Sequence, residues 1–401
     1  MKYLILIFFL SAGLCSAQFR YGDFATGDEV LLNDMKELIA GKNIAVITNK
    51  TGVDRNGNHF LNRLTEKGYS LKKIFTPEHG FSADDKFSNA GIEVPVVSLY
   101  GKKNSFSQND LEGIDVIIFD IQELGARFYT YTSTLYLTMQ DAAKYGKDYI
   151  VCDRPSLTNL NYAGGFILDE KFSSFVGKIP TPVIFGMTIG ELAKFLNEEY
   201  IKNPGFSVVK MKGYDRKTKF ENVMNVWVNP SPSIVSVDCA RNYPALCFLE
   251  GTNISEGRGT DSPFCVFGAP FVDSRKLLDE LNKYGFEGVE FSVTEFIPEQ
   301  EKLPSYTAMK FTGRKCFGVE MKVTDFSKYK PFDISVAILI ALKKTVPEFA
   351  WDKGNFIDKL AGTDRLRKMI NEGYSYEEII TESRKDSEEF FKLSSAYYLY
   401  Q

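Results

Sequence analysis

Short apolar runs rich in Val, Ile and Phe recur along the first half of the chain, separated by segments long enough to hold a helix. Near-continuous runs of this kind are typical of strands that are buried on both faces of a parallel sheet. The pattern predicts seven strands, at residues 43–49, 71–75, 94–100, 115–121, 148–153, 181–186 and 206–211.

Amphipathic segments between these runs predict helices. Residues 130–146 place Leu135, Met139 and Ala143 on one face and end at a glycine, which is common just past helix C-termini. Residues 188–200 begin with the Thr-x-x-Glu spacing of a capping box. The alternation of strand and helix predicts a Rossmann-like α/β domain with a parallel sheet, from about residue 26 to about residue 225.

The second half has a different pattern. Residues 229–271 are rich in Pro, Gly, Ser and Asn and show little periodicity, and long irregular stretches inside compact domains are usually functional loops. Further elements are expected beyond it, as helices at 274–285, 333–346 and 374–400 and strands at 289–293 and 316–325. We therefore expect a second, less regular α/β domain over residues 226–401.

Composition describes an ordinary globular protein, with 44% hydrophobic and 25% charged residues. The net charge of -4 argues against a nucleic-acid binder. Oligomeric state does not follow from the sequence.

Residues 1–17 carry Lys2, an apolar stretch and then Ser16 and Ala17, which predicts a cleaved secretory signal peptide. A lipid anchor at Cys15 is the less favoured alternative, because Leu14 precedes it in place of a small residue. The stretch is too short to span a membrane. We expect a secreted or periplasmic protein with no transmembrane segment.

Five cysteines remain after such cleavage, and an odd number fits buried thiols better than a disulfide framework. Cys239 and Cys247 could pair. With two histidines in the chain and no CxxC spacing, a Cys/His zinc site is improbable.

Polar side chains follow several of the predicted strands. Because parallel strands point the same way, their carboxyl ends gather at one edge of the sheet, where ligands bind. The candidates are Asn49, Thr51, Glu78, His79, Gln122, Glu123, Arg127, Tyr129, Tyr131, Asp153 and Arg154. Each has a structural alternative: a helix N-cap for a carboxylate, an ion pair at a turn for Asp153 and Arg154, or a helix start packed on the sheet for Arg127 and its tyrosines.

The run EGTNISEGRGT at residues 250–260 adds Glu250, Asn253, Glu256 and Arg258. Its alternative is a solvated Gly-rich loop. The run lacks the P-loop pattern and the third glycine of a dinucleotide fingerprint, and the chain has no GxSxG elbow. We expect no nucleotide, metal or other cofactor.

Carboxylates, arginines and aromatic side chains outside the cytoplasm suit glycoside hydrolysis, in which one carboxylic acid protonates the leaving oxygen and a second group acts as nucleophile or base. Tyr and Phe offer faces to sugar rings. Arginine suits an anionic sugar through bidentate pairing with a carboxylate.

The chain resembles the NamZ-type exo-β-N-acetylmuramidases, formerly a domain family of unknown function. The resemblance covers almost the whole chain after the signal peptide and rests on TNKTGV (48–53), FTPEHGF (75–81), SLYG (98–101), DIQELGARFYTYTSTL (120–135), DRP (153–155), FGMTIGELA (185–193), PSPS (230–233) and EGTNISEGRGTDSPFCVFGAPF (250–271). The last motif is long and highly specific.

The resemblance implies removal of terminal β-linked N-acetylmuramic acid from the non-reducing end of peptidoglycan fragments, in a cleft between a Rossmann-like domain and a second α/β domain. Glu78 would be the catalytic acid/base, with His79 as its orienting group or proton shuttle. Glu123, where the family usually has aspartate, or Glu256 would be the second carboxylate. Arg127 or Arg258 would hold the lactyl group.

Two motifs depart from the family pattern. This chain has DRPSLTNL and PSPS where the family commonly has DRPNP followed by glycines and PSPN, which affects the details of sugar contacts. Two other functions stay open: a non-catalytic muropeptide-binding protein, and an extracellular amidase or esterase for which Ser255 and Thr252 are weak nucleophile candidates.

Overall fold

The computed structural model describes residues 23–81, 86–89, 91–305 and 308–401. The predicted signal peptide lies outside these ranges. Within them, no helix combines the length and the apolar character that a membrane span requires. The five cysteines of the described ranges are buried and free, as expected for structural thiols.

The first half of the chain, up to about residue 225, forms a seven-stranded sheet in the order β3-β4-β2-β1-β5-β6-β7. All neighbours are parallel except β3 and β4. The strands are β1 (Asn43–Thr48), β2 (Ser70–Thr76), β3 (Lys86–Asn89), β4 (Ile92–Ser98), β5 (Val116–Asp120), β6 (Asp148–Cys152) and β7 (Phe206–Val209). This confirms the predicted Rossmann-like sheet.

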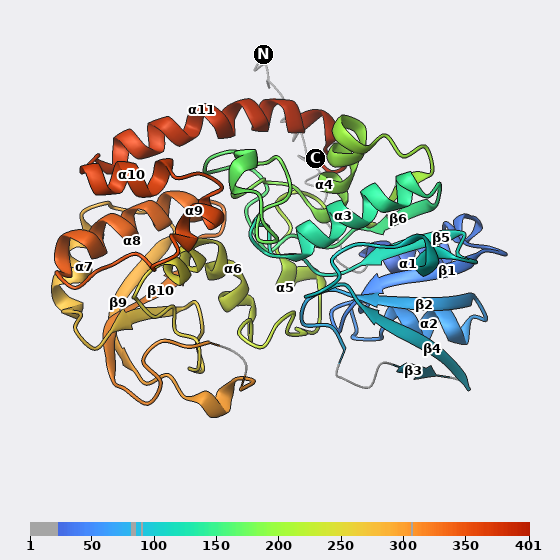
Figure 1. Ribbon diagram of the computed structural model, residues 1–401, viewed down its shortest axis with the longest axis horizontal. Helices are drawn as coiled ribbons and strands as arrows, with labels where there is room; N and C mark the ends of the chain where they lie inside the picture. Colours follow the sequence, from blue (N-terminus) through green and yellow to red (C-terminus); the bar gives the residue numbers. More distant parts are fainter. Residues whose placement is uncertain (1–22, 82–85, 90, 306–307) are drawn as a thin grey trace, which may run out of the picture.

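Helices cover both faces of this sheet (Figure 1). They are α1 (Gly27–Asn33), α2 (Phe60–Glu66), α3 (Tyr131–Lys144) and α4 (Ile189–Leu196). The short α5 (Phe220–Val223) follows β7 and lies near the middle of the molecule in Figure 1. Ala45 and Ile47 of β1 join the core cluster that α3 and α4 cover, whereas Ile44 and Val46 join the cluster under α1 and α2. Burial of both faces explains why these strands are continuous apolar runs.

The predicted strand at residues 181–186 is wrong. Ile184 exchanges backbone hydrogen bonds with Gly164, at 2.9 Å in each direction, and Val183 accepts one from the Arg127 amide. Pro182 has no amide proton to give to a sheet. The segment is therefore extended but pairs with loops, and the sheet gains instead the polar edge strand β3.

The second half forms a three-stranded antiparallel sheet in the order β8-β10-β9. Its elements are α6 (Val237–Leu246), β8 (Val266–Ala269), α7 (Ser274–Asn282), β9 (Val289–Phe296), β10 (Cys316–Val323), α8 (Pro331–Thr345), α9 (Phe356–Ala361), α10 (Arg365–Glu372) and α11 (Tyr376–Ser394). The stretch 229–271 is thus not wholly irregular, since it holds α6 and β8. Residues 239–246 of α6 are all buried, so this helix has no polar face for a periodicity to reveal.

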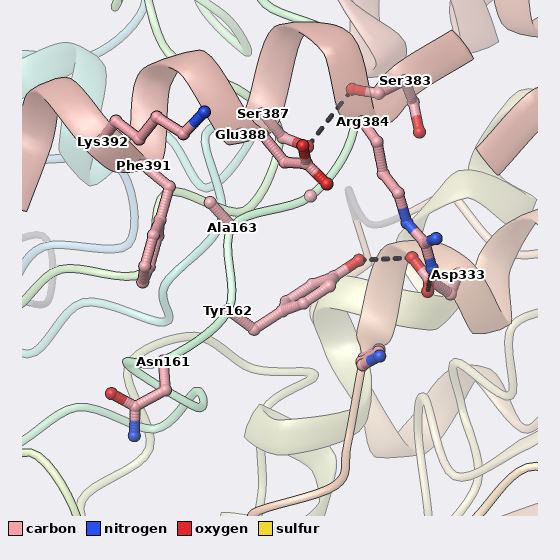
Figure 2. Close-up of a pocket in the computed structure, with 12 residues that line it drawn as sticks. Asn161, Tyr162, Ala163, Asp333, Ser383, Arg384, Ser387, Glu388, Phe391 and Lys392 are labelled. Atoms are coloured by element: carbon pink, nitrogen blue, oxygen red, sulfur yellow. Dashed lines mark hydrogen bonds and ion pairs between the residues drawn. The ribbon is translucent and has the colours of Figure 1, made fainter. Parts of the chain in front are cut away.

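The two halves pack against each other. In Figure 1, α11 passes above both halves and the C-terminus lies beside α4. Tyr400 donates a hydrogen bond of 2.7 Å to Asp153 at the end of β6. A cavity of about 460 Å³ lies among the loop at residues 161–164, α8 and α11, and there Tyr162 donates a 2.7 Å hydrogen bond to Asp333 (Figure 2). This hydrogen bond connects the first half, through Tyr162, to the second half, through Asp333.

Candidate active site

A larger cavity, of about 890 Å³, lies between the two halves on the carboxyl side of the seven-stranded sheet. After β1 the chain continues to β2, toward one edge of the sheet, and after β5 it continues to β6, toward the other edge. The boundary between β1 and β5 is therefore a topological switch point, where open α/β sheets bind ligands. The first half contributes residues 78–79, 100, 101, 104, 128–130 and 175–176. The second half contributes nine residues between 231 and 264, residues 308–310 and Phe356.

Glu78 projects from the loop that follows β2 and lines this cavity. Its Oε2 accepts a hydrogen bond of 2.8 Å from the hydroxyl of Thr130, the residue that precedes α3. The hydroxyl of Tyr100 donates a second hydrogen bond to Glu78, which raises the pKa of Tyr100 to about 12. Two hydroxyls from separate segments therefore hold this carboxylate at the cavity wall.

His79 lies beside Glu78, with 3.8 Å between its Nε2 and Oε1 of the carboxylate. Its φ of 58° is in the left-handed region, which non-glycine residues rarely occupy. Burial lowers the pKa of His79 from 6.5; Glu78 opposes this shift and Arg258 adds to it. The imidazole is therefore neutral at pH 7.

The opposite wall carries a cluster of charges around Glu256. Its Oε2 accepts a 2.9 Å hydrogen bond from Lys310, and its Oε1 lies 3.3 Å from Nε of Arg258. Arg258 also donates through Nη2 to Glu250 at 2.5 Å. Burial acts to raise the pKa of Glu256, but Lys310 and Arg258 outweigh it and bring it below 4.5. Glu256 is therefore ionised at neutral pH.

Aromatic rings close the inner end of the cavity. Tyr129, Tyr243 and Phe264 are buried and contact one another edge to face, with ring centroids 5.4 and 4.9 Å apart. Burial and the neighbouring hydroxyl of Tyr131 raise the pKa of Tyr129 well above 10, and the side chain of Ser231 acts in the opposite direction.

Six of the residues that the sequence predicted for the site line the cavity, namely Glu78, His79, Tyr129, Glu250, Glu256 and Arg258. Glu123 does not. Its Oε1 accepts hydrogen bonds from the amides of Gly125 (2.6 Å) and Ala126 (3.3 Å), and burial raises its pKa to about 8. This geometry favours a structural role for Glu123.

Arg127 is also away from the cavity. Its guanidinium is fully buried and donates to the carbonyl oxygens of Phe166, Thr181 and Leu360. Leu360 belongs to α9, so Arg127 links the two halves. Burial lowers its pKa to about 9, and no carboxylate within the described ranges opposes this shift.

Asp153 and Arg154 hold the sheet edge together. Asp153 accepts hydrogen bonds from Thr188, Tyr400 and the Gly190 amide. Arg154 pairs with Asp120 at 2.6 Å. Both are buried, and neither lines the cavity. The alternative of an ion pair between them is wrong for the described residues, because Arg154 pairs with Asp120 and Asp153 accepts only from hydroxyls and amides.

The other predicted polar residues form hydrogen bonds within the protein. Asn49 donates to the Tyr131 hydroxyl (2.8 Å) and accepts from Thr51, and the Thr51 hydroxyl accepts from the Gln122 amide (2.9 Å). Tyr131 in turn donates to the Pro230 carbonyl. Asn253 bonds to the backbone of Glu348 and Ala350. None of these residues lines the cavity.

Sequence reasoning missed several cavity residues, among them Tyr100, Thr130, Phe175, Tyr243 and Lys310. Tyr100 follows β4 and could have been found with the other residues at strand ends. Lys310 had no such signal, because it reaches Glu256 from the long β9–β10 connection. The described residues include no group of three or more His, Cys, Asp or Glu side chains suited to hold a metal ion.

Comparisons with known proteins match both halves of the chain. The model of the N-terminal part of the exo-β-N-acetylmuramidase NamZ matches residues 44–238, and that of its C-terminal part matches residues 241–400. The curated peptidoglycan β-N-acetylmuramidase NamZ of Bacillus subtilis is 38% identical over 387 residues, which are 94% of this chain and 91% of that protein.

Two crystal structures of DUF1343 family proteins from Bacteroides fragilis are also similar. One has a TM-score of 0.86 and 32% identity, and the other a TM-score of 0.73 and 31% identity. In both cases the similarity covers 94% of this chain and 99% of the other. The residues that line the cavity all lie within the two ranges that the NamZ family models match.

Proposed function

The chain belongs to the NamZ family of exo-β-N-acetylmuramidases, and from this premise we propose how its cavity hydrolyses peptidoglycan fragments. The enzyme is a glycoside hydrolase that releases terminal N-acetylmuramic acid from the non-reducing end. One observation carries the proposed mechanism: the Glu78 carboxylate lies at the cavity wall, held by Thr130, in the same cavity as the charged cluster of Glu256 and Arg258.

Glu78 acts as the general acid that protonates the leaving oxygen, and as the base that later activates water. After the proton has left, the hydroxyls of Thr130 and Tyr100 donate hydrogen bonds to the carboxylate, which stabilises the product of the transfer. The neutral His79 is close enough to orient Glu78 or to relay its proton.

Glu256 is the favoured second carboxylate. Its ionised form suits stabilisation of the positive charge that develops on the sugar during glycoside cleavage. Glu123, the other candidate from the sequence, hydrogen-bonds to backbone amides outside the cavity, which makes it the weaker choice.

Arg258 is the favoured partner of the lactyl carboxylate. Its Nε and Nη2 face Glu256 and Glu250, so that within the described part of the chain Nη1 remains for a substrate anion. A guanidinium can pair with more than one carboxylate through its separate donors. The other candidate, Arg127, directs its donors to backbone carbonyls.

Product analysis tests the function. The protein is incubated with the disaccharide of N-acetylmuramic acid and N-acetylglucosamine and with muropeptides, and the products are identified by mass spectrometry. We expect free N-acetylmuramic acid from the non-reducing end. Binding without product would support the muropeptide-binding alternative, and release of peptides or acyl groups would support an amidase or esterase.

The finer substrate and the location are part of the proposal. We infer that the enzyme acts on muropeptides and disaccharides after secretion or in the periplasm, because residues 1–17 have the sequence of a signal peptide. Fractionation of cells expressing the full chain checks this: activity confined to the cytoplasmic fraction would contradict it.

A further inference from the structure

Two aromatic rings stand at the outer end of the active-site cavity. Tyr100 follows β4, and Phe175 comes from the loop between β6 and α4. Their ring centroids are 5.9 Å apart at an interplanar angle of 48°. Tyr100 is 48% exposed, whereas the aromatic residues at the inner end are buried. The aromatic ring of Tyr100 is thus exposed to solvent beside Glu78, the proposed acid.

The backbone holds Tyr100 next to Glu78. The amide of Leu99 donates a 2.8 Å hydrogen bond to the carbonyl of Thr76, two residues before Glu78, and the Leu99 side chain is fully buried. Gly101 then turns the chain with a φ of 90°, which favours glycine. The position of the Tyr100 ring is therefore fixed relative to the carboxylate.

Phe175 is presented by a tight turn. Ser174 and Gly177 exchange backbone hydrogen bonds of 3.0 Å in both directions, so that Phe175 and Val176 form the two-residue tip of a hairpin. Such tips are usually occupied by Gly, Asn or Asp. The side chains of Phe175 and Val176 both line the cavity. A role in contacting a ligand would explain why apolar residues occupy this turn.

We propose that Tyr100 and Phe175 form the face that binds the sugar on the leaving-group side of the cleaved bond, a β-linked N-acetylhexosamine. The proposal rests on the proposed function. An exo-acting enzyme takes the terminal sugar into the more enclosed part of its site, and here the buried rings of Tyr129, Tyr243 and Phe264 line that part. The next sugar must then lie toward solvent.

Glu78 marks the boundary between the two sugars. It is bonded to Thr130, adjacent to Tyr129 at the inner end, and to Tyr100 at the outer end. Since Glu78 protonates the oxygen that joins the two sugars, a sugar bound on the Tyr100 side is the leaving group. The apolar C–H face of a pyranose can pack on the aromatic rings there, as other apolar groups do.

Phe175→Ala tests the proposal, because Phe175 packs beside the Tyr100 ring and its side chain has no hydrogen-bonding group for Glu78. We expect the KM for the disaccharide to rise about tenfold with a smaller change in kcat. Inhibition by N-acetylglucosamine should weaken, while inhibition by N-acetylmuramic acid should stay within about twofold. Phe175→Tyr, which keeps a ring, should restore most of the affinity.

Tyr374→Ala is the matched control, since Tyr374 is 42% exposed and lies outside the cavity; its KM should be that of the wild type. An unchanged KM in Phe175→Ala, or an equal loss of affinity for both monosaccharides, would overturn the proposal. If the wild-type protein released no N-acetylmuramic acid, the proposed function itself would fail, which is a separate result.

Discussion

Glu78 and Glu123 both follow strands of the large sheet, but their surroundings give the two carboxyl groups different chemistry. Glu78 receives hydrogen bonds from two hydroxyls and faces a cavity. Glu123 is buried against backbone amides, and burial raises its pKa to about 8. At neutral pH, therefore, Glu123 is mostly protonated and is held inside the protein.

Replacement of Glu123 by Gln should change the pH dependence of stability. Between its unfolded pKa of about 4.3 and its folded pKa of about 8, the folded state keeps a proton that the unfolded state releases. Stability thus falls as pH rises through this window, by at most about 1.4 kcal/mol per pH unit. Glu123→Gln retains the acceptor oxygen and removes this slope. Urea unfolding from pH 5 to 8 measures it, and an unchanged slope would contradict the account.

Replacement of His79 by Asn tests whether the neutral imidazole of His79 takes part in catalysis. Asn tolerates the left-handed backbone that His79 adopts, so the protein should fold with an unchanged melting temperature. Because the pKa of His79 is lowered from 6.5, the imidazole gains its proton only below pH 6.5, on the acid side of the pH–rate profile. We expect kcat about 100-fold lower and loss of that ionisation. A wild-type profile in His79→Asn would exclude His79 from the mechanism.

At the scale of elements, the C-terminal segment holds the edge of the sheet in place. Tyr400 donates to Asp153 after β6, and the Leu399 amide donates to Glu191 in α4. Asp153 is fully buried, so bulk solvent does not reach it to replace a lost donor. This makes the end of the chain part of the support for the active-site half.

Tyr400→Phe should therefore destabilise the protein by about 1–2 kcal/mol without changing the KM. The reason is that Asp153, which loses a hydrogen bond, does not line the cavity. Chemical denaturation and steady-state kinetics on the same preparation measure both quantities. A changed KM with unchanged stability would instead support Asp153 as a substrate-binding residue.

The elements that the sequence predicted well are those whose pattern is set locally. Strands such as β1 and β5 are buried on both faces and have continuous apolar sequences. The segment 181–186 has the same appearance, but tertiary pairing with Gly164 decides its structure. The buried helix α6 was missed for the opposite reason, since it lacks a polar face.

The candidate site divides in the same way. Glu78 and His79 were predictable, because residues at the carboxyl ends of parallel strands meet at one edge. The sequence could not predict which side chains point into the cavity, because their directions depend on contacts between residues far apart in the sequence. Arg127 donates a hydrogen bond to the carbonyl of Leu360, 233 positions later in the sequence. Lys310 donates to Glu256, 54 positions earlier.

For the whole molecule, the cavity exists only because the halves are joined. The first half brings the proposed acid, the second half brings the charged cluster, and buried contacts such as those of Arg127 and Tyr162 hold the two together. In the proposed mechanism, a terminal sugar would meet Glu78 on one side and Arg258 on the other. The central claim is that Glu78 performs the proton transfer.

The most direct test compares Glu78→Gln with Glu123→Gln in release of N-acetylmuramic acid from the disaccharide. The two changes are identical in chemistry, and circular dichroism confirms that each variant is folded. We expect Glu78→Gln to lose at least about 100- to 10,000-fold in kcat, and Glu123→Gln to stay within a few-fold of wild type. Full turnover by folded Glu78→Gln, or loss of turnover only in Glu123→Gln, would contradict the account.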